Sequence, residues 1–504
     1  MAGLGRSMLV NVGGRAWTAV VQIAFMPVLL RLLGADGFGL IGVFLTLQAA
    51  ALVLENAYAM TVNREIARRR DSDPASVPGV LRTAEILAWG TATGFAVLLA
   101  LLTPLLADAW VSAETLADAT LARALWLMAP ALGLQLGAGL YVGALLAGGR
   151  HGTANALLVT TATLRSGGAA AVLLTAGGGV LTYFAWQIAV ALLHAALGRL
   201  LAWRHVGRHV GRGSEAGGER RFVRAHLRLF ASFGGGMLGI GLLGALLTQM
   251  DRIVLARWAG LSELGYYTFA AGLAGVLLYL AGPITQGVFP SLSAALGRGD
   301  RAEAGSVFAL GTQVLGAVAI PAGLVLAVFG REVVTVWTGD AALAARLAPL
   351  LALLAVGSTL NALVYLPSHL YLASGRTGLV AGFSAGAAVI LGLALVPLVD
   401  RHGALGAAAG WVGLNLAYVL VLAPLLLRRV LPGAAPAWAG RAVLVPAVVA
   451  AVPVGLARLA LPADAPLAAT VGLPVAAGLA AVTAAALAAP EVRRRLVRRR
   501  RAPS

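Results

Sequence analysis

Charged side chains inside long apolar stretches are the residues of this sequence most able to do chemistry. Arg165 lies near the middle of the stretch 153–175, and Arg15 lies beside Asn11 in the stretch 9–33. A charge at membrane depth costs at least ~2.5–3.5 kcal/mol, so it should face protein or a wet cavity. Arginine suits phosphate because its planar guanidinium donates two parallel hydrogen bonds and stays charged in a poor solvent. We therefore expect Arg165, Arg15 and Asn11 to bind an anionic substrate.

A structural role stays open for both arginines. Arg165 could instead bond backbone carbonyls freed around Gly167 and Gly168. Arg15 is close enough to a helix end to extend its guanidinium to the membrane interface.

Carboxylates at membrane depth give the complementary signal. Glu55 lies well inside an apolar stretch, and Asp251 with Arg252 closes another. A carboxylate in the membrane can take up a proton or a sodium ion and so couple transport to a gradient. The alternatives are a salt bridge from Glu55 to Arg15 or Arg64 and a solvated pair of Asp251 with Arg252. Arg64 is also a candidate for binding the substrate.

Polar amides inside the apolar stretches are weaker candidates, because most amides in membrane helices hydrogen-bond between helices. With Arg252, the further candidates for a polar lumen are Asn56, Gln135, Gln249 and Asn361. The chain has no cysteine, and its seven histidines are scattered. A P-loop, a G-x-S-x-G motif and a cluster with metal-ligand spacing are all absent from the sequence. We therefore expect no enzyme, no metal site and no cofactor other than a coupling H⁺ or Na⁺.

The elements that would position these residues are helices that cross a membrane. Of 504 residues, 60% are apolar and 12% charged, and the mean hydropathy is +0.87. Soluble domains are about 25% charged, so an ordinary soluble enzyme is excluded. Apolar stretches of ~18 residues or more predict about fourteen transmembrane helices in an all-α polytopic membrane protein. The predicted spans are 9–33, 40–61, 79–106, 121–147, 153–175, 180–203, 229–250, 265–289, 305–329, 343–373, 377–399, 403–427, 441–461 and 466–489.

Arginines predict how the helices are oriented, because basic loops stay on the cytoplasmic side. The arginine-rich connections alternate along the chain, and they are 62–78, 148–152, 199–228, 290–304, 374–376, 428–440 and the tail after Pro490. The connection 107–120 is acidic instead. This pattern predicts that both termini are cytoplasmic. It also accounts for the net charge of +18, and an anchor against anionic lipid explains the tail better than a nucleic-acid site does.

Two motifs recur at a spacing of 226 residues. An arginine followed by two glycines occurs at Arg31, Gly34 and Gly39, and again at Arg257, Gly260 and Gly265. The run Leu146 to Gly152 matches Leu372 to Gly378. We expect two six-helix lobes related by an axis along the membrane normal, a parallel pseudo-twofold repeat. The predicted parts are an N-lobe 1–203, a basic cytoplasmic linker 204–228, a C-lobe 229–427, two extra helices 441–489 and a basic cytoplasmic tail 490–504.

Several of these motifs resemble one family of transporters. They are N-x3-R from Asn11, P-V-L-L-R-L-L-G-A-D-G-F-G from Pro27, L-E-N around Glu55 and N-R-E-I-A-R from Asn63. Further along lie Gln249-Met250-Asp251-Arg252, Leu264-Gly265-Tyr266-Tyr267 and Val288-Phe289-Pro290-Ser291-Leu292-Ser293. Together they resemble the polysaccharide-export (Wzx-like) flippases of the MOP/MATE superfamily. Glu55-Asn56 departs from that family, which often has Asp followed by Leu or Gly.

The resemblance implies a MOP/MATE-like fold and a flippase in the bacterial cytoplasmic (inner) membrane. By alternating access it would move an undecaprenyl-diphosphate-linked oligosaccharide from the cytoplasmic to the outer leaflet for surface polysaccharide biosynthesis. By position it also places Arg15, Arg64, Glu55 and Asp251 where the family has polar residues. The implied partners are the anionic lipid-linked saccharide, membrane lipids, a polysaccharide polymerase and glycosyltransferases, with no nucleic acid.

Three other functions stay open. A MATE-type cation-coupled multidrug exporter would carry substrates that are usually cationic, which a lumen rich in arginine repels. A peptidoglycan lipid-precursor flippase would carry a similar anionic lipid. A membrane glycosyltransferase or polymerase would normally need a sizeable outer loop, and the longest outer connection here is 107–120.

Overall fold

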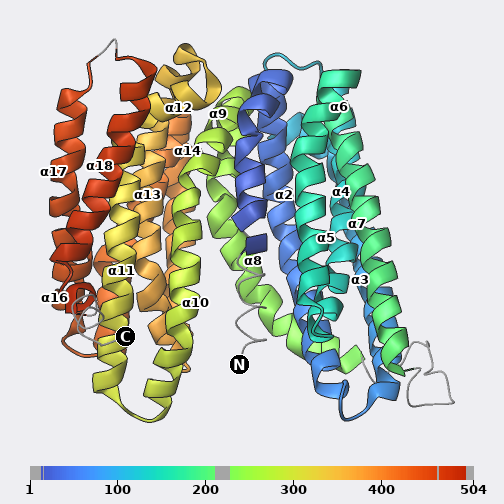
Figure 1. Ribbon diagram of the computed structural model, residues 1–504. Helices are drawn as coiled ribbons and strands as arrows, with labels where there is room; N and C mark the ends of the chain where they lie inside the picture. Colours follow the sequence, from blue (N-terminus) through green and yellow to red (C-terminus); the bar gives the residue numbers. More distant parts are fainter. Residues whose placement is uncertain (1–12, 15, 211–226, 463–464, 495–504) are drawn as a thin grey trace. The chain divides into compact units, whose positions relative to one another are not determined.

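The computed structural model describes residues 13–14, 16–210, 227–462 and 465–494. Nearly all of these residues are helical, and no strand occurs among them (Figure 1). This confirms the all-α class. The chain divides into two compact units, Met1–Gly265 and Tyr266–Ser504.

The first unit is built from seven described helices and the start of an eighth. They are α2 (Met26–Arg69), α3 (Val77–Leu105), α4 (Asp118–Ala147), α5 (His151–Thr163), α6 (Ala169–Ala176), α7 (Gly179–Val210), α8 (Leu227–Trp258) and α9 (Gly260–Ala274). A 3₁₀ turn at Pro74–Ser76 precedes α3, and π-helical turns occupy Leu106–Trp110 and Leu164–Gly168.

The second unit contains the remaining helices. They are α10 (Val276–Gly297), α11 (Arg301–Val328), α12 (Gly330–Thr338), α13 (Ala341–Ala373), α14 (Gly378–Ala417), α15 (Ala423–Val430), α16 (Ala434–Trp438), α17 (Val445–Ala460) and α18 (Leu467–Ala488). π-Helical turns at Tyr418–Leu422 and Ala439–Leu444 join α14 to α15 and α16 to α17. The helix α12 is a short element that the sequence analysis assigned to a connection.

Eleven helical stretches in the described part of the chain are long and apolar enough to cross a membrane. Fourteen were predicted, and the difference lies in three places. One stretch, Gly378–Val430, covers two predicted spans. The predicted span 229–250 lies in α8, and the span 9–33 begins outside the described residues. The number fourteen is therefore approximate.

Glycines in the left-handed region of φ break the chain at equivalent places in the two copies of the repeat. Three pairs are each 226 residues apart, and they are Gly34 (φ 72°) with Gly260 (φ 80°), Gly149 (φ 73°) with Gly375 (φ 76°), and Gly177 (φ 66°) with Gly403 (φ 54°). The last pair also shares its ψ, −138° and −134°. Glycine adopts this conformation without steric cost. The backbone thus has the internal repeat that the two sequence motifs predicted.

Residues related by the repeat also contact each other within the first unit. Asp36 accepts a hydrogen bond of 2.6 Å from the hydroxyl of Ser262, which is 226 residues away. The other oxygen of this buried carboxylate accepts bonds from the backbone N–H of Glu114 and from the N–H and hydroxyl of Thr115, at 3.1, 2.7 and 2.7 Å. One carboxylate therefore fastens α2, α9 and the connection before α4.

Two glycines make this contact possible. A Cβ on Gly39 would overlap the carbonyl oxygen of Leu261, and a Cβ on Gly265 would overlap that of Ala35. The two clashes are mirror copies, because each partner also lies 226 residues from its counterpart. The glycines at this spacing therefore allow two helix backbones to touch, the usual role of small residues between membrane helices.

The lobe boundaries stay a prediction, because the compact units follow packing rather than the repeat. Helix α8 packs on α2, so it belongs to the first unit. The part 211–226 of the predicted linker and the part 495–504 of the predicted tail lie outside the described residues.

The two C-terminal helices pack side by side and against α11 (Figure 1). Ala450 and Val454 of α17 join Ala477 and Ala481 of α18 around Phe329. The side chain of Arg458 donates a 2.6 Å hydrogen bond to Glu332 of α12. The pair is therefore attached to the second unit by packing and by an ion pair.

We expect Gly39→Leu to prevent stable folding, because the new side chain has to displace the backbone carbonyl of Leu261. The melting temperature in detergent, read by fluorescence-detected size exclusion, tests this. The control is Gly94→Ala, an exposed helical position where a Cβ meets nothing within 4 Å. It should leave stability unchanged or raise it by about 0.5–1 kcal/mol. Equal melting temperatures for Gly39→Leu and the wild type would contradict the close contact.

Candidate functional site

A π-helical turn carries Arg165 into the middle of the first unit. The wider π-turn, Leu164–Gly168, interrupts the regular hydrogen bonds between α5 and α6. Two side chains of α7 take up freed carbonyls: Trp186 donates to Leu164 at 2.7 Å and Gln187 donates to Arg165 at 3.2 Å. The alternative in which the arginine bonds these carbonyls itself is therefore not needed, because α7 supplies the donors.

The side chain of Arg165 is half-buried, and its Nε is shielded without a hydrogen-bond partner among the described residues. The charge of Glu55 on α2 is close enough to act on it electrostatically. Glu55 is also half-buried and packs against Gly139 of α4, where a Cβ would overlap the carboxylate. The structure thus brings two of the predicted site residues together.

Two residues of α7 complete what we call the Arg165 cluster, which consists of Glu55, Arg165, Tyr183 and His194. Both Tyr183 and His194 are buried and lie within electrostatic reach of Arg165. Neither ring nitrogen of His194 has a hydrogen-bond partner in the described part of the chain. The sequence analysis missed these two residues, because a lone Tyr or His in an apolar stretch has no spacing that marks it.

Gln135 lies in the same unit and is buried, as the sequence analysis expected of a polar residue inside the membrane. Its Oε1 accepts a 2.5 Å hydrogen bond from Gln48 of α2, whereas its Nε2 has no partner among the described residues. One donor of this amide pair is therefore left over at membrane depth.

The remaining predicted residues of the first unit are not gathered in this cluster. Arg64 and Asn56 are exposed. Asn11 and Arg15 lie outside the described residues. The structure therefore does not test the proposed salt bridge from Glu55 to Arg15.

The second predicted group lies on α8, where Arg252 donates to Gln249 at 2.7 Å. Asp251 accepts a 2.8 Å bond from the backbone N–H of Arg252. All three are half-buried, so the pair is less solvated than an exposed ion pair. Asn361, in the second unit, donates a 2.6 Å hydrogen bond to the fully buried Asn415, which is the inter-helix role that most amides take.

A network around Glu85 of α3 is the polar site that sequence reasoning missed. One carboxylate oxygen accepts bonds from Tyr141 at 2.9 Å, Arg199 at 3.1 Å and Trp203 at 2.8 Å. The other accepts from Arg82 at 3.0 Å. Glu85 is only 2% exposed. The i, i+3 spacing of Arg82 and Glu85 was the available signal, but the other partners come from α4 and α7.

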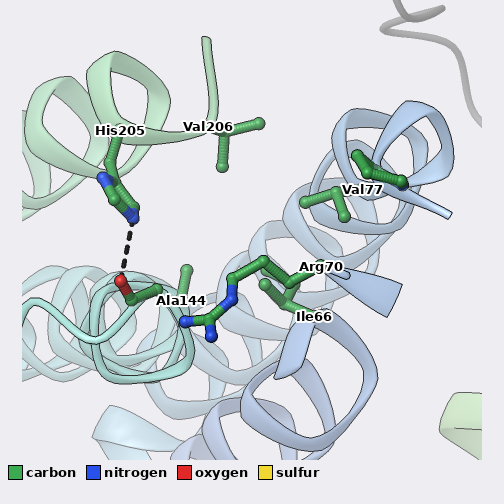
Figure 2. Close-up of a pocket in the computed structure, with 8 residues that line it drawn as sticks. Ile66, Arg70, Val77, Ala144, His205 and Val206 are labelled. Carbon is green, nitrogen blue, oxygen red and sulfur yellow. Dashed lines mark hydrogen bonds between the residues drawn. The ribbon is translucent and has the colours of Figure 1, made fainter. Parts of the chain in front are cut away.

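Nearby, His205 joins α7 to the turn after α4 (Figure 2). Its Nε2 lies 3.1 Å from the carbonyl oxygen of Gly148, and its Nδ1 accepts a 3.2 Å bond from Arg150. Because Nδ1 accepts, Nε2 carries the proton and donates to Gly148. The pocket beside it, lined by Ile66, Arg70 and Val77 among others, measures about 20 Å³. That volume holds a single water molecule, so this is a packing joint rather than a ligand site.

Comparisons with known proteins agree on one family and one fold. The family model described as polysaccharide biosynthesis protein matches residues 4–296. No curated protein matches the sequence.

Solved structures match over most of the chain. The inward closed conformation of the lipid II flippase MurJ has a TM-score of 0.74 at 10% identity, covering 97% of this chain and all of that one. An inward-facing multidrug resistance MATE family transporter of the MOP superfamily has a TM-score of 0.68 at 14% identity, covering 82% and 94%. A MOP superfamily transporter from Pyrococcus furiosus has a TM-score of 0.58 at 14% identity, covering 85% and 95%. These matches confirm the predicted MOP/MATE-like fold.

Glu85→Ala should destabilise the protein by about 3–5 kcal/mol, because it leaves two arginines and two further donors without their acceptor. Denaturant unfolding in detergent measures the loss. The matched control is Glu303→Ala, which removes a carboxylate from an exposed pair with Arg298. That change should cost about 0–1 kcal/mol. Similar losses for the two variants would show that the Glu85 network is not structural.

Proposed function

Because the chain belongs to the polysaccharide biosynthesis protein family and has the fold of MOP transporters, we propose that it flips an anionic lipid-linked saccharide. It is a multi-pass membrane protein. The proposed substrate is an undecaprenyl-diphosphate-linked oligosaccharide, moved by alternating access from the cytoplasmic to the outer leaflet of the bacterial inner membrane. The lipid tail stays in the bilayer while the protein replaces the water lost by the head group.

The observation that carries this proposal is the incompletely bonded guanidinium of Arg165 at membrane depth. It is half-buried, its Nε lacks a partner among the described residues, and the nearby carbonyls are already bonded by α7. A buried cation with donors to spare attracts a diphosphate, which accepts charge-assisted hydrogen bonds. Glu55 keeps the local charge from growing too positive, so that the product can leave.

Glu55 is the proposed coupling residue. A carboxylate at membrane depth that has a cation near it can exchange a proton or bind Na⁺ as the cycle proceeds. Substrate arrival would compete with Glu55 for Arg165, which links ion binding to substrate binding. The proposed working partners are glycosyltransferases and a polysaccharide polymerase.

A peptidoglycan-precursor flippase is the second candidate, favoured by the match to a lipid II flippase over 97% of this chain. The Arg165 cluster suits either lipid diphosphate. A cation-coupled drug exporter is disfavoured, because Arg165 repels the cationic substrates typical of such exporters. Competition between an undecaprenyl-diphosphate oligosaccharide and lipid II in one flipping assay separates the first two candidates.

Arg165→Ala should lower flipping about a hundredfold, because two charge-assisted hydrogen bonds of ~1.5 kcal/mol each are lost. The measurement is the accessibility of a labelled head group in vesicles that contain the purified protein. The control, Arg123→Ala, removes an exposed arginine at the other end of the first unit's helices. Unchanged flipping by a folded Arg165→Ala variant would reject the proposed role.

Gly139→Ala should displace the Glu55 carboxylate without changing its charge. If Glu55 couples transport, both Gly139→Ala and Glu55→Gln should remove the acceleration of flipping by an imposed H⁺ or Na⁺ gradient. Gly94→Ala serves as the control for a helical glycine. A Glu55→Gln variant that still responds to the gradient like the wild type would eliminate this carboxylate as the coupling residue.

A further inference from the structure

A groove on the first unit lies between α3, α4 and α7, away from the Arg165 cluster in its lining. Its volume is about 470 Å³. Charged and aromatic residues line one part of it and apolar residues the rest, among them Arg82, Glu85, Trp89, Leu134, Leu192 and Arg199. We call it the α3–α7 groove.

The charged part of the groove has an excess of cationic donors. Arg82 and Arg199 each place one nitrogen on the carboxylate of Glu85, at 3.0 and 3.1 Å. Their side chains are nevertheless 41% and 58% exposed, so the remaining guanidinium N–H groups are accessible. Two guanidinium groups and one carboxylate give a local charge of about +1. The Glu85 network therefore holds two arginines in fixed positions with donors to spare.

The apolar part continues from these arginines along the helices. Leu192 is 52% exposed and Ile86 is 42% exposed, as side chains that face acyl chains would be. Ala195 and Ala196 are small, which leaves room between α7 and the neighbouring helices. Trp89 lies at the boundary between the two parts, where aromatic side chains are enriched in membrane proteins.

We propose that the α3–α7 groove binds an anionic phospholipid. Its phosphodiester lies between Arg82 and Arg199, and one acyl chain follows Ile86, Leu134 and Leu192. The groove lies near the arginine-rich connections 62–78 and 199–228, the end expected to face the anionic cytoplasmic leaflet. Basic pockets between membrane helices bind anionic head groups in this way.

Charge complementarity favours a bilayer phospholipid over the lipid-linked substrate. A phosphodiester carries one negative charge, which balances the local charge of about +1 once Glu85 has been counted. A diphosphate carries more charge than the groove neutralises. The bound lipid would then connect α3 to α7 across the open side of the groove and stabilise the first unit.

The experiment is native mass spectrometry of the full-length protein with dioleoyl phosphatidylglycerol, compared with dioleoyl phosphatidylcholine. The wild type should retain one phosphatidylglycerol in preference to phosphatidylcholine. The double variant Arg82→Gln with Arg199→Gln should bind phosphatidylglycerol about tenfold more weakly, because its charge-assisted hydrogen bonds become neutral ones. Retention equal to the wild type would overturn the proposal.

Two further variants keep the test independent of folding. Ala196→Phe fills the groove from an exposed position and leaves the Glu85 network intact, so it should also lose the lipid. Arg123→Gln removes an exposed arginine elsewhere on α4 and should retain it. Displacement of phosphatidylglycerol by equimolar undecaprenyl phosphate would assign the groove to the carrier lipid and reject the phospholipid.

Discussion

The absence of hydrogen-bonding partners in hydrocarbon is the constraint on which the rest of this structure depends. Each backbone group that a helix break releases, and each charge carried into the membrane, has to be satisfied by the protein itself. The π-turn at Leu164–Gly168 meets this requirement with Trp186 and Gln187 of α7. Asp36 meets it with four donors, from Glu114, Thr115 and Ser262. Polar groups thus decide which helices lie together.

The internal repeat makes one of these solutions economical in sequence. The same Arg-Gly-Gly spacing provides a left-handed break at Gly34 and Gly260 and a close backbone contact at Gly39 and Gly265. Because each copy packs against the carbonyl of the other's equivalent segment, a single motif specifies both surfaces of the contact. A substitution in one copy therefore affects the turn or the contact without an independent element to compensate.

How much could be predicted from the sequence depends on the range of the signal. Periods and repeats are local or regular, so the helices, the all-α fold and the 226-residue repeat were predictable. Arg165 and Glu55 were predictable as single residues, because a charge in an apolar stretch stands out. The Glu85 network was not, because its partners Tyr141 and Arg199 are 56 and 114 residues away. The partners of a buried carboxylate are set by tertiary packing, which no spacing along the chain reveals.

The two intramembrane arginine sites differ in how completely the carboxylate is bonded, and this difference separates their roles. Glu85 accepts four hydrogen bonds, so its position is fixed and a change of partner would be costly. Glu55 acts on Arg165 through space, and the Nε of Arg165 keeps a donor without a partner among the described residues. A saturated network stabilises one arrangement of helices. An unsaturated pair can exchange its partners for a ligand, and transport requires that exchange in every cycle.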